Sequence, residues 1–244
     1  MTELSIETQQ SPQRVASAPP VGPRPLEDFA QVLIKLFAGL GSLAVEWSWS
    51  ELILRAGWLP HRTLPPDLIV EASDVEDADK RLAGFFRERW PEVEESLRQS
   101  VQAAAIDDAA TDAFAESLQA HRLGLYRVAP TLLFPHIERV ARDALQPGAM
   151  GASPTARLSD AVGTLGASEF VMPGVSGLRL YSKLADHLYR QVRAPDEVAA
   201  AENNPVPNRH AVLHGRVNYA SEKSSLNMLI MADFIFDAIS KLKP

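Results

Sequence analysis

Apolar residues recur at helical spacing along most of the chain, and no segment alternates apolar and polar residues for long. The stretch LEDFAQVLIKLFAGL, which starts at Leu26, is the first such helical segment. Between about residues 110 and 146 the pattern is longer, with a break or kink expected near Pro130 and Pro135. A further helical pattern covers residues 175–192. These patterns predict an all-α protein.

The last part of the chain predicts a closing helix. Ser221 is placed as its N-cap and Glu222 lies in its first turn. An apolar stripe at every fourth position follows, made of Leu226, Ile230, Phe234 and Ala238. We therefore expect an amphipathic helix that packs along this stripe.

The composition of successive segments divides the chain into three parts. Residues 1–25 are rich in Pro, Ser and Gln and poor in large apolar groups, so we expect a disordered tail. Residues 26–120 are predicted to form an N-terminal helical region, and residues 121–244 a second helical domain. Within the second domain, residues 195–208 read as a polar connection.

The overall composition excludes several classes of protein. With 244 residues and 46% hydrophobic residues, the chain can bury a substantial core. The absence of cysteine excludes disulfides, thiolate metal sites and cysteine nucleophiles, and it suits a reducing compartment. No uninterrupted apolar stretch of about 18 residues and no basic, apolar leader is present, so we expect a cytoplasmic protein without membrane spans.

Charge is distributed unevenly along the chain. The net charge of -7 argues against nonspecific coating of nucleic acid, which needs many cations to neutralise phosphates. Residues 1–120 contain 10 Lys and Arg against 20 Asp and Glu, whereas residues 121–244 contain 14 against 11. A site that handles phosphate is therefore expected in the second part, unless the difference is merely an uneven surface charge.

The stretch PNRHAVLHG, residues 207–215, carries an unusual group of polar side chains. On a helix His210 and His214 would lie about 40° apart on one face, while Arg209 and His214 would lie about 140° apart. Two histidines at this spacing suit zinc, but the intervening residues contain no glutamate, and a third ligand is not evident. In a purely structural interpretation, Asn208 caps a short helix, Arg209 forms a surface ion pair and His214 ends the helix before a glycine turn.

Together with its neighbours, this motif resembles that of the HEPN family, the higher eukaryotes and prokaryotes nucleotide-binding domains. Their helical bundles carry R-x(4 to 6)-H, often with Asn, Asp or His directly after the arginine, as in RHAVLH here. An upstream segment like P-x-I-E-x-x-x-R is matched by FPHIERVAR, which places Glu138 and Arg142 four residues apart. The resemblance covers about residues 121–241.

The resemblance implies a metal-independent ribonuclease that needs no cofactor. Histidine titrates near neutrality, so His214 is the expected general base or acid. The planar guanidinium of Arg209 would clamp phosphate oxygens, and His210 would orient the phosphate or supply the complementary proton transfer. Glu138 would hold Arg209 or Arg142 in place.

Further expectations concern substrate and partners. Arg142, Asn208 and Arg216 are expected to contact the substrate, which we expect to be single-stranded RNA. Because Arg209 and His214 do not easily converge from one straight helix, a homodimer is expected to complete the site. The resemblance also implies a toxin or antiphage effector with an antitoxin or other regulatory partner. The alternative from the same family is a non-catalytic module for RNA binding or protein interaction.

Overall fold

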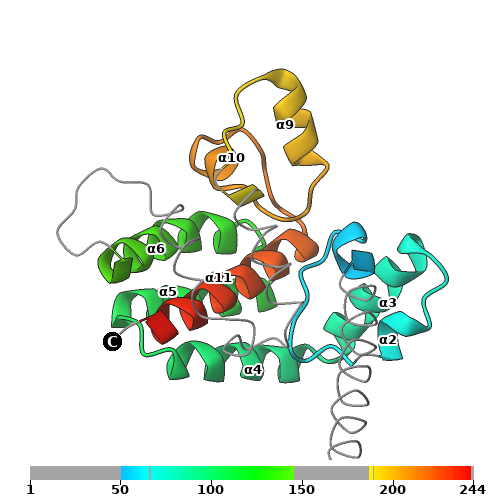
Figure 1. The fold of residues 1–244 in the computed structure, drawn as a ribbon, viewed down its shortest axis with the longest axis horizontal. Coiled ribbons are helices and arrows are strands. Elements are labelled where there is room, and N and C mark those ends of the chain that lie inside the picture. The colour runs from blue at the N-terminus through cyan, green and yellow to red at the C-terminus, as the bar shows by residue number, and fades with distance from the viewer. Residues whose placement is uncertain (1–50, 66, 146–186, 189, 243–244) are drawn as a thin grey trace, which may run out of the picture. The chain divides into compact units, whose positions relative to one another are not determined.

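The computed structural model describes residues 51–65, 67–145, 187–188 and 190–242 (Figure 1). These residues form helices and no strand, so the predicted all-α fold class is confirmed. The predicted tail, the helix expected from Leu26 and most of the pattern at residues 175–192 lie outside the described residues. Among the helices described, none is both long and apolar enough to cross a membrane.

From α2 to α6 the helices follow one another with short connections. Residues 51–55 are helical as well. The helices are α2 (Asp67–Val70), α3 (Val75–Glu88), α4 (Trp90–Ala103), α5 (Asp108–Arg122), α6 (Val128–Leu145), α9 (Pro195–Glu202), α10 (Arg209–Leu213) and α11 (Glu222–Leu242).

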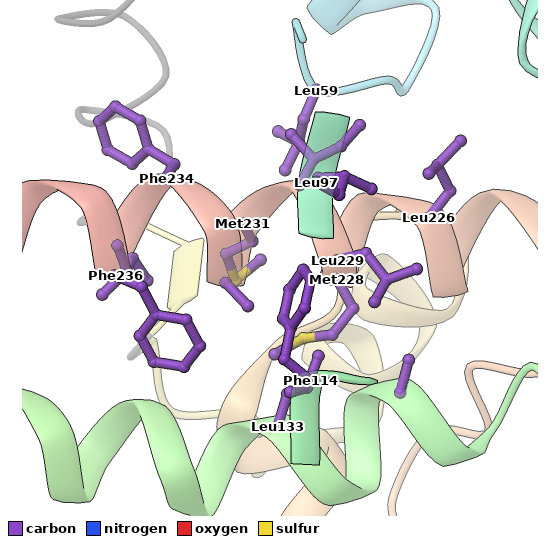
Figure 2. Close-up of a cluster of buried hydrophobic side chains, with 14 of the residues drawn as sticks. Leu59, Leu97, Phe114, Leu133, Leu226, Met228, Leu229, Met231, Phe234 and Phe236 are labelled. Carbon is purple, nitrogen blue, oxygen red and sulfur yellow. The ribbon is translucent and has the colours of Figure 1, made fainter. Parts of the chain in front are cut away.

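Helix α11 is the central element of the core. It packs against α4, α5 and α6, and Figure 2 shows its side chains meeting Leu97, Phe114 and Leu133 from those helices. Every residue from Ser224 to Phe236 is buried. The predicted stripe is buried, but the expectation of a one-sided amphipathic helix is wrong, because neighbours cover the remaining faces too.

The predicted long helix at residues 110–146 is two helices, and the break is not at either proline. Helix α5 ends at Arg122, and Gly124 follows its C-cap residue Leu123 with a φ of 74°, the left-handed conformation that glycine adopts readily. The N–H of Gly124 donates to His121 O at 3.0 Å, and the N–H of Leu125 donates to Ala120 O at 2.8 Å. This pair of bonds is the Schellman pattern of helix ends. Pro130 lies in the first turn of α6, where no backbone N–H is needed.

The polar connection predicted at residues 195–208 contains a helix, α9. Pro195 starts it, which suits the fixed φ of proline. Asp196 and Glu197 lie in the first turn, and the Glu197 carboxylate accepts from the backbone N–H groups of Arg193 and Ala194 at 2.7 and 2.9 Å. The prediction of a polar connection did not include this helix, although these N-terminal signals and the alanines that follow favour one.

The described residues belong to one compact unit that runs from Ser42 to Pro244. The predicted boundary between residues 120 and 121 falls inside α5. Helices on both sides of it share one buried cluster, which includes Leu97 from α4 and Leu229 from α11.

Two buried histidines make the stability of this core dependent on pH. His61 is 2% exposed, and burial, with a smaller contribution from Arg62, lowers its pKa to about 3. His121 is buried beside Ser225, whose Oγ lies 2.8 Å from its Nδ1, and burial lowers its pKa to about 4. Both side chains are therefore neutral in the folded protein at neutral pH.

Acidification from pH 6.5 to 5 is expected to destabilise the protein. In the unfolded chain each histidine takes up a proton near pH 6.5, whereas the folded chain binds it only near the pKa values of about 3 and 4. The free energy of unfolding should fall by up to about 1.4 kcal/mol per pH unit for each histidine. Urea denaturation at a series of pH values measures the slope. His121→Gln should reduce it by roughly half, and a wild-type stability independent of pH in this range would contradict the prediction.

Candidate functional site

The short helix α10 and its C-cap contain residues 209–214, RHAVLH, which we call the Arg209 motif. Asn208 fixes where the helix starts. The Asn208 Oδ1 accepts from the N–H of Ala211 at 2.9 Å, as the N-cap prediction requires. Its Nδ2 donates to His187 O at 2.6 Å and to Arg190 O at 2.9 Å, and the residue is 1% exposed. Because all the polar atoms of this side chain are used internally, the structure gives Asn208 a positioning role in place of the predicted substrate contact.

The other end of α10 is closed by a second Schellman turn. His214 is the C-cap, and Gly215 follows with a φ of 61°. The N–H of Gly215 donates to Val212 O at 3.0 Å and that of Arg216 donates to Ala211 O at 2.8 Å. The predicted glycine turn is confirmed, and it leaves the side chains of His214 and Arg216 exposed.

Arg209 pairs with Glu138 across 71 residues of sequence. Helix α10 packs against α6, which brings the Arg209 Nη2 to 3.0 Å from Glu138 Oε2, and Nε also forms an ion pair with Oε1. The side chains are 30% and 16% exposed. This contact uses one edge of the guanidinium and leaves Nη1 outside the ion pair. Of the two arginines considered for Glu138, the structure selects Arg209; Arg142 is exposed and forms no ion pair within the described residues.

The two motif histidines lie against each other. The ring centroids of His210 and His214 are 4.4 Å apart at an interplanar angle of 47°, in keeping with their predicted common face. The N–H of Val192 donates to His210 Nδ1 at 3.3 Å, so the neutral ring carries its proton on Nε2. Burial lowers the pKa of His210, and electrostatic interactions with His214, Arg216 and Arg193 lower it further. His210 therefore presents an Nε2–H donor at neutral pH.

Helix α10 thus displays two separate pairs. Arg209 reaches toward α6 and Glu138, while His210 and His214 form the ring pair. No hydrogen bond or ion pair joins Arg209 to His214 in the part of the chain that is described, as their angular separation on a helix suggests. Arg216 donates to Arg193 O at 3.2 Å at the exposed surface.

The zinc hypothesis finds no additional ligand. Across residues 51–65, 67–145 and 190–242, no three His, Asp or Glu side chains are grouped closely enough to hold a metal ion. His210 and His214 would therefore supply two ligands where a structural or catalytic zinc site needs at least three from the protein.

A cavity of about 650 Å³ lies next to this region and was not anticipated from the sequence. Its polar lining comes from segments far apart in the chain: Arg55, His187, Arg190, Asn203 and Asn204. An adjoining cavity of about 110 Å³ shares three of these residues and is also lined by Asn208. Neither cavity is lined by Arg209, His210 or His214. No motif links the lining residues, so only the folded chain reveals the group.

Comparisons of the chain with protein-family models, with curated proteins and with solved structures found no match.

Proposed function

We propose that the protein is a metal-independent endoribonuclease that cleaves single-stranded RNA at the Arg209 and His214 motif. The observation that carries the proposal is the ion pair between Arg209 and Glu138. It supports a role for both matched segments in one site, because the residues come from the two stretches on which the HEPN resemblance rests.

The chemistry suits cleavage by the RNA's own 2′-hydroxyl. A base must remove the hydroxyl proton, an acid must protonate the leaving 5′-oxygen, and cations must stabilise the phosphorane that forms between these steps. His214, which is exposed, acts as the base or acid. Arg209, held by Glu138, donates from Nη1 to a phosphate oxygen. His210 donates from Nε2 to the same phosphate, because Val192 occupies its other ring nitrogen.

One chain offers a single exposed histidine for two proton transfers, and a homodimer supplies the second. A two-fold axis beside α10 would bring a His214 from each copy to one phosphate, one as base and the other as acid. Leu213, which precedes His214, is 40% exposed and would be covered in such a contact. Sedimentation at micromolar concentration is expected to give a dimer, and a strict monomer would count against this arrangement.

The purified protein is expected to cleave single-stranded RNA in the presence of excess EDTA. The products should carry 2′,3′-cyclic phosphate ends, because the proposed base activates the 2′-hydroxyl rather than water. Gel electrophoresis of an end-labelled RNA measures the cleavage, and mass spectrometry of the products identifies their ends.

An RNA with a 2′-deoxy residue at the cleaved position is the matched control and should resist cleavage there. Cleavage that stops with EDTA would argue for a metal site instead. RNA binding without any cleavage would favour the non-catalytic module, with α10 acting only as a contact surface.

A further inference from the structure

We propose that the cavity of about 650 Å³ is a binding site for a ligand that carries a phosphate group. The site is separate from the Arg209 motif, and the proposal does not depend on the nuclease activity. The proposal rests on the charge of the cavity lining, on the hydrogen bonds that fix the cavity walls and on the cavity volume.

The lining of the cavity is cationic. Arg55 and Arg190 supply the positive charge, and no Asp or Glu is among the lining residues. Both arginines are exposed, and neither forms an ion pair with any carboxylate in the described ranges. Arg62 and Arg122, in contrast, are paired with Asp233 and Glu94. The two cavity arginines therefore have unused donors, in the fork geometry that binds phosphate oxygens well.

A single buried side chain holds two walls of the cavity together. Asn227 on α11 is fully buried, and its Nδ2 donates to Gly57 O at 2.9 Å and to Pro205 O at 3.3 Å. Its Oδ1 accepts from the N–H of Leu59 at 2.9 Å. The segments around residues 57 and 205 are therefore fixed relative to each other before any ligand binds, which reduces the entropic cost of binding.

The same two walls approach too closely for any residue but glycine at position 57. Gly57 has a φ of 75°, and a Cβ built on it would lie 2.7 Å from Pro205 Cγ.

A third wall of the cavity is held by His187, whose Nε2 donates to Val206 O at 2.7 Å. With this bond, the neutral ring keeps Nδ1 as an acceptor, which lies 3.5 Å from Asn204 Nδ2.

The size and the remaining lining indicate what kind of molecule fits. A volume of about 650 Å³ is within the range of small-molecule sites. Leu54, Leu59 and Val206 add apolar surface beside the arginines. A small organic phosphate would place its charged group against Arg55 and Arg190 and its body against this apolar surface. The phosphate can come from a monoester of a small molecule or from a diester in an RNA strand.

Isothermal titration calorimetry on the full chain tests the proposal. The probes are inorganic phosphate, ribose 5-phosphate and a six-nucleotide RNA, with non-cleavable 2′-O-methyl groups and no terminal phosphate. We expect at least one phosphate probe to bind, and the double variant Arg55→Gln, Arg190→Gln to weaken its affinity by roughly tenfold or more. Arg127→Gln, at an exposed arginine outside the cavity, is the matched control and should bind like the wild type.

The two phosphate sources give different results, and each would support the site. Tight binding of ribose 5-phosphate with weak binding of the RNA indicates a monoester ligand. Tight binding of the RNA, with ribose 5-phosphate competing against it for the cavity, indicates a diester ligand. His214→Ala should not change this competition, which distinguishes the cavity from the proposed nuclease site. If no probe binds, or if the double variant binds as well as the wild type while both are folded by circular dichroism, the proposal is overturned.

Discussion

His214→Ala is expected to lower the rate of RNA cleavage by about 10² to 10⁴-fold, the range typical of losing a general acid or base. The imidazole is exposed at the C-cap of α10, so its removal takes away the proposed proton transfer with little loss of packing. Stability should change by less than about 1 kcal/mol, as for most surface substitutions. Cleavage of end-labelled RNA under single-turnover conditions gives the rate, and sedimentation verifies the oligomeric state.

The matched control for this variant is His136→Ala. His136 lies two positions from Glu138 on α6, and therefore on nearly the opposite side of that helix. The His136→Ala variant should cleave RNA at the wild-type rate. If His214→Ala also cleaves normally and arrests growth like the wild type on expression, the catalytic assignment is wrong and an interaction module becomes the better account of α10.

Asn227→Ala is expected to lower the free energy of unfolding by about 3 to 5 kcal/mol. The substitution leaves the N–H of Leu59 and the carbonyls of Gly57 and Pro205 without their partner. An unsatisfied buried polar group costs about 1 to 3 kcal/mol, and the deleted amide leaves a void as well. Urea denaturation followed by circular dichroism measures the loss.

A suitable control for Asn227→Ala is Asn218→Ala, because Asn218 is exposed in the turn before α11. It should change stability by no more than about 0.5 kcal/mol. A loss below 1 kcal/mol for Asn227→Ala would mean that the three bonds are replaced by other contacts. The walls of the cavity would then not depend on this side chain.

Features that depend on neighbouring residues were predictable from the sequence. Asn208 caps α10, Gly215 ends it, and the Ser221 Oγ accepts from the N–H of Ser224 at 3.0 Å at the start of α11. Each is a contact within about four residues, so the local sequence contains nearly all the information needed. The same proximity explains why His210 and His214 were expected on one face.

The candidate site was predictable only as a set of residues. Glu138 was singled out with two possible partners, and the packing of α10 on α6 decided for Arg209. The break between α5 and α6 was missed, although Gly124 is a local signal for it, because the two prolines drew the expected break further along. The all-round burial of α11 was missed because it depends on how many helices surround it.

By itself, the sequence determined the helical fold class, the caps of the last two helices and the position of the Arg209 motif, because these follow from short-range periodicity and hydrogen bonding. Only the tertiary structure decided which carboxylate holds Arg209, that His61 is buried, and that Arg55 and Arg190 line one cavity with His187. The residues involved are far apart in the chain, and Arg55 and Arg190 are separated by about 135 positions. These outcomes depend on the packing of whole helices around α11, which no short stretch of sequence specifies.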